Sequence, residues 1–218
     1  MSEKIKVGVL VENHPYDVIG FQKMLESFTD CECYVQPVDL YVNDVDNNHL
    51  KYDTLIYYNI DCPAPKEGSN LRRYLAEDAG KTEQGIILLH HALLNWRQWD
   101  VYTDMSGVRQ RGEGGLFKYT QGQTVNSHVI DHAHPITAGI EDFTLIDETY
   151  IIGEPEEPGN RVLITTDNDL SIDNIAWTRQ YKNSRVFCYA SGHDDRVYSH
   201  PTFRKILHNA ILWTSNKI

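Results

Sequence analysis

The sequence predicts one α/β domain over residues 1–218, built on a mostly parallel sheet with helices on both faces. Three short apolar runs, at 5–11, 53–59 and 85–89, are typical of strands that are covered on both faces. Segments with helical spacing of apolar residues alternate with these runs, which favours parallel strands joined by helices. A chain of 218 residues can bury one substantial core, so a single domain is expected.

Strand signals continue through the second half of the chain. The run RVFCYA at 185–190 is apolar and resembles the covered strands of the first half. Two carboxylates, Asp147 and Glu148, interrupt an otherwise apolar strand, and burial of such a pair is costly unless both have partners. In chain order, we expect strands at 5–11, 33–38, 53–59, 85–89, 123–131, 145–152, 161–166, 174–178 and 185–190.

Four segments have the apolar spacing of helices. Pro15 suits the first turn of the first helix, because its ring fixes the backbone angle φ near the helical value. Gly80 suits the position just after the second helix, where a left-handed backbone is common. The acidic, Asn-rich segment 43–49 is expected to be a connection. We expect helices at 15–28, about 71–79, about 92–101 and from about 199 to beyond 211.

The segment 103–122 has no clear periodicity and contains five glycines. Irregular loops longer than roughly 12–15 residues are often functional, so this arm is interpreted as a lid or a contact surface. A variable surface insertion explains the composition equally well.

Composition excludes several classes of partner. A formal net charge of −11 without a basic stripe argues against nucleic acid and against polyanionic substrates. No apolar run has the length of a membrane span, and the N-terminal segment has no signal-peptide core, so we expect a cytoplasmic protein without a membrane partner. The four cysteines form no CxxC pair and are expected to be reduced thiols.

Histidines follow three of the expected strands. His14 comes after the first, His90 and His91 come after the strand 85–89, and His193 follows the last long strand. Because the carboxyl ends of parallel strands meet at one edge of a sheet, we expect these side chains to converge on a ligand site. Histidine suits such a site because its pKa lies near neutrality and its ring nitrogens bind metals.

Several short motifs occur together in order along nearly the whole chain. They are GIILLHHA at 85–92, HPIT at 134–137, DETY at 147–150, IAW at 175–177, and RVF at 185–187 leading into GHD at 192–194. In this combination the sequence resembles the ThuA-like, or trehalose-utilisation, family of the class I glutamine amidotransferase-like superfamily. The resemblance implies a flavodoxin-like, doubly wound sheet.

The resemblance also implies a change of chemistry. The superfamily carries a cysteine nucleophile at the elbow after the central strand and a His-x-Glu pair after a late strand. At the position that resembles this elbow, the chain has His90. His193, together with Asp194 or Asp195, lies near the position of the His-x-Glu pair. A histidine cannot replace a thiolate in forming an acyl thioester, so we expect no glutaminase activity.

The family name implies a sugar or keto-sugar as the ligand. We expect catalytic roles for His90 and His193, helped by Asp194 and Glu148, in an isomerase, lyase or hydrolase. A divalent metal such as zinc, held by His14, His90 and His193 with a carboxylate, is the second form of this hypothesis.

Other polar and aromatic residues near the same edge are candidates for contact with the sugar. Aromatic rings stack on apolar sugar faces, although such rings more often fill a core. The candidate substrate-binding residues are His14, His91, Asn59, Trp96, Tyr102 and Trp177.

Two hypotheses from other classes remain. One is a non-catalytic sugar-binding or regulatory module that retains the amidotransferase-like fold. The other is an interaction subunit that forms a homo-oligomer through the 103–122 arm. The histidines at 128, 132 and 134 resemble a metal cluster by spacing, but strand alternation favours a structural role for them.

Overall fold

The computed structural model describes residues 3–44, 47–109, 111 and 117–218, and it confirms the α/β class. Its strands join into one nine-stranded sheet. They are β1 (Ile5–Glu12), β2 (Cys31–Pro37), β3 (Thr54–Asn59), β4 (Gly85–Leu89), β5 (Lys118–Val129), β6 (Phe143–Ile151), β7 (Arg161–Thr166), β8 (Asn174–Tyr181) and β9 (Ser184–Tyr189).

The sheet is mixed and has two halves. Its strand order is β2-β1-β3-β4-β9-β8-β7-β5-β6. The strands from β2 to β9 in this order pair in parallel, so their carboxyl ends share one edge. From β9 onward every pairing is antiparallel. The parallel half therefore has the crevice-forming edge expected from the sequence, and β9 connects it to the antiparallel half.

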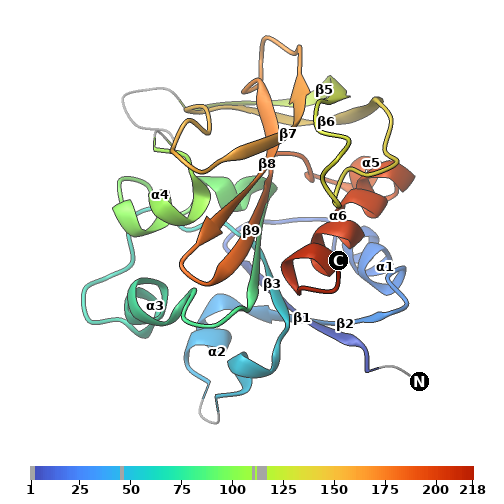
Figure 1. The fold of residues 1–218 in the computed structure, drawn as a ribbon. Coiled ribbons are helices and arrows are strands. Elements are labelled where there is room, and N and C mark those ends of the chain that lie inside the picture. The colour runs from blue at the N-terminus through green and yellow to red at the C-terminus, as the bar shows by residue number, and fades with distance from the viewer. Residues whose placement is uncertain (1–2, 45–46, 110, 112–116) are drawn as a thin grey trace.

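Helices cover both sides of the parallel half. Figure 1 shows α1 and α6 on one side and α2, α3 and α4 on the other. A near-continuous core fills the space between them, with strand residues such as Val7, Leu55 and Ile87 fully buried. The helical elements are α1 (Val18–Glu26), α2 (Val38–Val42), a 3-10 turn (Asn48–Lys51), α3 (Asn70–Arg73), a π turn (Tyr74–Asp78), a 3-10 turn (His90–Leu94), α4 (Asp100–Ser106), α5 (Asp195–Tyr198) and α6 (Pro201–Thr214).

Two helix boundaries differ from the sequence prediction. The first helix does not begin at Pro15, because Asp17 is its N-cap and accepts a hydrogen bond from the backbone N–H of Gly20. The prediction of a helix at 92–101 is wrong, because a 3-10 turn follows β4 and α4 begins only at Asp100. Gly80 does follow the second helical segment with a φ of +78°, as the sequence predicted.

The irregular arm is shorter than the sequence predicted. Residues up to Ser106 belong to α4, and β5 begins at Lys118. Val108 and Arg111 have no exposed surface, and the Arg111 guanidinium donates to the backbone oxygens of Asn95 and Trp96. These parts of the arm are core rather than a free lid. Gly112, Gly114 and Gly115 lie outside the described residues.

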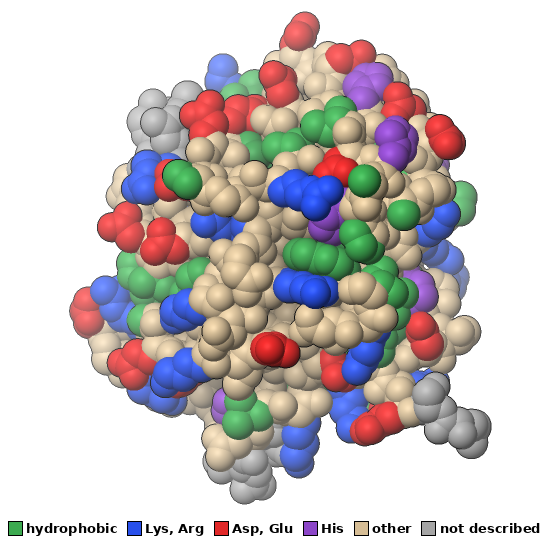
Figure 2. Space-filling view, viewed as in Figure 1, with side chains coloured by type: hydrophobic (Ala, Val, Ile, Leu, Met, Phe, Trp, Pro, Cys, Tyr) green, Lys and Arg blue, Asp and Glu red, His purple; other side chains and the backbone are tan. Residues whose placement is uncertain are grey.

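The surface agrees with the composition. Acidic and basic side chains are interspersed on the face drawn in Figure 2. Within the part of the chain that the structure describes, no helix has the length and apolar character to cross a membrane.

Candidate functional site

The chain turns sharply where β4 ends, and His90 stands at this turn. Its φ is +54°, a left-handed value that is uncommon outside glycine, so the surrounding structure must hold the turn in place. The His90 ring is fully buried, and its Nδ1 donates a hydrogen bond to the backbone oxygen of Ala190, 2.7 Å away. The other ring nitrogen, Nε2, faces Tyr150 and Glu148.

The histidines from three strand ends meet, as parallel strands require. His14 stacks on His91 with ring centroids 4.1 Å apart, and His90 and His193 lie 5.4 Å apart. Burial and the neighbouring His90 lower the pKa of both His14 and His91. The neutral forms of these two rings are therefore favoured at the site.

Glu148 on β6 faces the histidine pair. Its Oε1 lies 3.6 Å from Nε2 of His90 and 3.7 Å from Nδ1 of His193. Burial acts to raise the pKa of this carboxyl, but the interaction with His90 and the hydrogen bond from Tyr150 outweigh it and lower the pKa to about 2. Glu148 is consequently an ionised group directed at two imidazoles.

Tyr150 completes this group, and sequence reasoning gave it no role. Its hydroxyl is hydrogen-bonded to His90 Nε2 at 2.8 Å. Burial raises the pKa of Tyr150 well above its ordinary value, so the hydroxyl stays protonated. Strand alternation was the available signal, because residues 148 and 150 share one face of β6.

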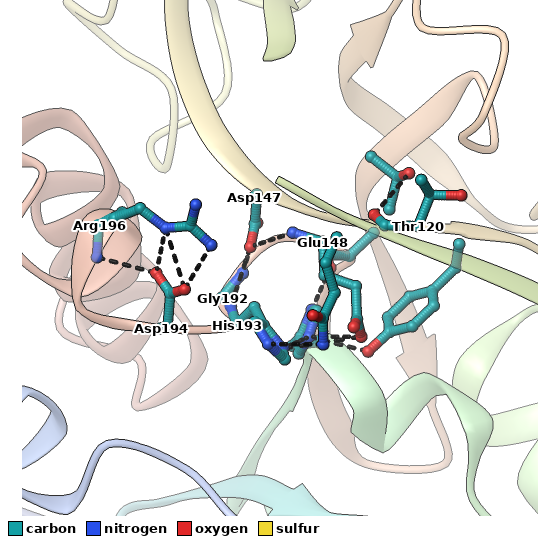
Figure 3. A network of polar contacts seen from close by, with 12 residues as sticks. Thr120, Asp147, Glu148, Gly192, His193, Asp194 and Arg196 are labelled. Atoms are coloured by element: carbon teal, nitrogen blue, oxygen red, sulfur yellow. Dashed lines mark hydrogen bonds and ion pairs between the residues drawn. The ribbon is translucent and has the colours of Figure 1, made fainter. Parts of the chain in front are cut away.

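Asp147 points to the opposite side and fixes the loop after β9. Its carboxylate accepts the backbone N–H of Gly192 at 2.8 Å and that of His193 at 3.0 Å, and the N–H of Glu148 as well. Figure 3 shows Asp147 between Gly192 and Glu148. Three backbone donors therefore compensate the buried charge that the sequence marked as costly.

Asp194 does not join the site. Its carboxylate accepts from the backbone and guanidinium of Arg196, and it caps α5. In Figure 3 this pair lies on the side of His193 away from Glu148. The prediction that Asp194 assists the histidines is corrected, because Asp194 is the N-cap of α5 and its carboxylate binds Arg196.

A cavity of about 320 Å³ opens beside Glu148. The expected residues His14 and His91 line it, whereas His90 and His193 are not among the lining residues. Its aromatic and polar lining from β5 was not predicted. The lining residues are His14, Ile60, His91, Leu94, Arg97, Phe117, Tyr119, Gln121, Glu148 and Tyr150.

The structure does not bring the other expected sugar-binding residues to this cavity. Trp96, Tyr102 and Trp177 have no exposed surface, and each donates to a neighbouring residue inside the fold. Asn59 is also buried and accepts a hydrogen bond from Asn95. These four residues belong to the core. For the aromatic rings, packing in the core was the stated alternative to contact with a sugar.

The candidate metal ligands also differ from the sequence prediction. One nitrogen of His90, one of His193 and an oxygen of Glu148 lie within 4.8 Å of one another. His14 is not part of this group, although its ring centroid is 6.2 Å from that of His193. Glu148 therefore supplies the carboxylate that was expected beside the histidines, and His14 is the expected ligand that lies outside the group.

The three histidines of the 128–134 segment do not converge. His134 is buried, and its Nδ1 accepts the backbone N–H of Ile136 in the turn. His128 lies at the surface and pairs with Asp142. This arrangement favours structural roles for both residues.

Comparison with known protein families shows to which family the chain belongs. A model of the trehalose utilisation family, ThuA, matches residues 35–214. The chain belongs to the ThuA family. No curated protein matches it in sequence.

Solved structures of ThuA-like proteins share the fold. A putative ThuA-like protein from Parabacteroides merdae is 15% identical, with a TM-score of 0.73 over 98% of this chain and 91% of that one. Another from Bacteroides uniformis is 17% identical, with a TM-score of 0.72 over 98% and 93%. A protein of Salmonella typhimurium described as cytoplasmic is 12% identical, with a TM-score of 0.69 over 96% and 99%.

Proposed function

We propose that this ThuA-family protein is an enzyme of carbohydrate metabolism that moves protons on a sugar or keto-sugar. The observation that supports this most strongly is the ionised Glu148, which lines a cavity and lies within 3.7 Å of nitrogens of His90 and His193. The family description, trehalose utilisation, supports a carbohydrate as the substrate class. An isomerase, a lyase and a hydrolase each need such groups.

Of the two histidines beside Glu148, His193 is the better placed to exchange a proton with a substrate. Its side chain keeps 17% of its surface exposed, whereas that of His90 has none. When His193 takes a proton from a carbon next to a carbonyl, the Glu148 carboxylate stabilises the imidazolium that forms. The Tyr150 hydroxyl, held by His90 in the free protein, can turn to donate to the oxyanion that develops on the substrate.

A divalent metal such as zinc is the second form of this proposal. His90, Glu148 and His193 would hold it, and this N/O donor set is one that zinc accepts. Bound there, the ion would polarise a substrate carbonyl as a Lewis acid. The chain's own contribution in both forms is to hold Glu148 at the cavity and His193 next to Glu148.

The proposal excludes glutaminase activity. The elbow after β4 carries His90, and the thiol of Cys188 on the neighbouring strand β9 is buried and donates to the backbone oxygen of Ser106. The order of the five parallel strands supports a flavodoxin-like, doubly wound core around this elbow. The cytoplasmic description of the Salmonella typhimurium neighbour supports a cytoplasmic location for this chain as well.

Incubation of the purified protein with a panel of glycosides and their 3-keto derivatives tests the proposal. Products are identified by mass spectrometry and NMR. We expect conversion of at least one compound, with a loss of roughly 10²–10⁴-fold in His193→Ala and in Glu148→Gln. His132→Ala, at an exposed histidine outside the site, is the matched control and should keep wild-type conversion.

Two outcomes would contradict the proposal. One is equal conversion by wild type and His193→Ala. The other is binding of a sugar, seen by ligand-observed NMR, without any product. The second result would support the non-catalytic binding module instead.

A further inference from the structure

A second cluster of metal-ligating side chains lies where the turn into β2 meets α6. Asp30 and Cys31 stand at this turn, and His208 lies in the middle of α6. Nε2 of His208 is 2.7 Å from Oδ1 of Asp30, and Sγ of Cys31 is 3.6 Å from the same oxygen. We infer that these three residues form a zinc-binding site that is separate from the proposed active site.

The position of the cluster separates it from His90. Cys31 is at the amino end of β2, whereas His90 follows the carboxyl end of β4, and parallel strands place these ends at opposite edges of the sheet. In Figure 1, α1 and α6 lie side by side on one face of the sheet, and the turn between α1 and β2 brings Asp30 to α6.

The donor set and its spacing fit zinc. A thiolate, an imidazole and a carboxylate are all zinc ligands, and the three ligand atoms lie within 4.8 Å of one another. Zinc bonds of about 2.0–2.3 Å in a tetrahedron place ligand atoms roughly 3.3–3.6 Å apart. The separation of Cys31 and Asp30 already has this value. The His208 and Asp30 atoms would need to part by only roughly 0.6 Å.

The surroundings orient the donors and leave the cluster accessible to an ion from solvent. The His208 ring stacks on Phe28 with centroids 5.3 Å apart and an interplanar angle of 8°, which fixes the plane in which Nε2 faces Asp30. Asp30 and His208 are partly exposed, so an ion can approach from solvent. A water molecule from solvent would complete the tetrahedron as the fourth ligand.

A simple ion pair between Asp30 and His208 would also join α6 to the turn, but it would not require a thiol beside the same carboxylate oxygen. On zinc binding the Cys31 sulfur loses its proton to solvent and forms the S–Zn bond, while His208 and Asp30 bind through nitrogen and oxygen. The metal would then connect positions 178 residues apart in the sequence. Because the unfolded chain lacks this arrangement, binding would stabilise the fold.

Cobalt substitution tests the inference on the full chain. Cobalt bound to a thiolate gives a charge-transfer absorption band, which the cluster of His90, Glu148 and His193 cannot give because it has no sulfur. We expect one equivalent of cobalt with this band, displaced by zinc, and a higher Tm in zinc. Cys31→Ser and His208→Gln should each abolish the band and weaken binding by at least roughly tenfold.

The control variant is Cys62→Ser, at an exposed thiol after the carboxyl end of β3, which should keep the band. His208→Gln keeps a side-chain N–H for Asp30, so far-UV circular dichroism should show an unchanged fold. If Cys31→Ser does not fold, His208→Gln alone tests the zinc site. The inference is overturned if wild type shows no band, if the band survives in His208→Gln, or if Cys62→Ser removes it.

Discussion

Two adjacent carboxylates on β6 have opposite electrostatics because neighbouring residues of a strand point to opposite faces. Asp147 faces backbone N–H groups in a fully buried position, and this burial raises its pKa. Glu148 faces two histidines, which lower its pKa to about 2. One carboxylate therefore shapes the loop that carries His193, and the other supplies negative charge to the candidate site.

Sequence reasoning identified His14, His90 and His193 because strand ends in a parallel sheet must meet. It did not identify Tyr150, although the same alternation that exposes Glu148 to the histidines places Tyr150 beside it. It also expected Trp177 at the sugar, whereas that ring fills the core. Residue type and spacing do not reveal which face of a strand is turned toward a cavity.

Tyr150→Phe removes the hydroxyl that is hydrogen-bonded to His90 and leaves the ring in place. We expect kcat/KM for the converted sugar to fall by roughly 10–1000-fold, as for loss of an oxyanion donor, with a stability loss of about 1 kcal/mol for one hydrogen bond. Tyr119→Phe is the matched control, since Tyr119 lines the same cavity but is exposed. Equal activity of Tyr150→Phe and wild type would remove Tyr150 from the proposed chemistry.

At the scale of elements, the strands could be predicted because a strand that is buried on both faces needs a continuous run of apolar residues. The segment after β4 was predicted wrongly. It has helical spacing, yet Trp96 and Gln98 have φ values of +42° and +60°, which an α-helix does not allow. The backbone N–H of Trp96 instead donates to Asp61 at 2.7 Å. This contact between distant segments leaves no pattern in the local sequence.

The connection between β6 and the loop after β9 depends on one carboxylate. Asp147→Asn replaces one acceptor oxygen by an NH₂ group, which cannot accept from Gly192 or His193. Leaving a buried N–H without a partner costs about 1–3 kcal/mol, so we expect urea denaturation to show a loss of that size. Activity should fall as well, because His193 loses its anchor.

Asp194→Asn is the control for this variant. Asparagine remains a good N-cap for α5, and the exposed ion pair with Arg196 contributes at most about 1 kcal/mol. The role given to Asp147 would be wrong if both variants were equally stable and equally active.

At the scale of the molecule, the candidate site lies where the two halves of the sheet join. The parallel half supplies His14, His90 and His193, and the antiparallel half supplies Glu148 and Tyr150. The sequence predicted the first group because strand-helix alternation determines where its strand ends lie. It could not place the second group, since the pairing of β5 with β6 and β7 depends on contacts between distant segments.

The pH dependence of stability should follow from two buried groups with lowered pKa values. Burial lowers the pKa of His134 from 6.5 to about 4, so the unfolded chain binds this proton more readily between these values. Glu148 has a pKa of about 2 in the fold against 4.5 when unperturbed. Both groups therefore favour unfolding as the pH falls, His134 from about 6.5 to 4 and Glu148 from about 4.5 to 2.

We expect each group to remove on the order of 1–3 kcal/mol of unfolding free energy across its own window. Urea denaturation at a series of pH values measures this slope. His134→Asn keeps an acceptor for the Ile136 N–H but cannot titrate, so it should flatten the upper window only. Glu148→Gln should flatten the lower window only. Parallel curves for wild type and both variants would show that other groups determine the acid sensitivity of the fold.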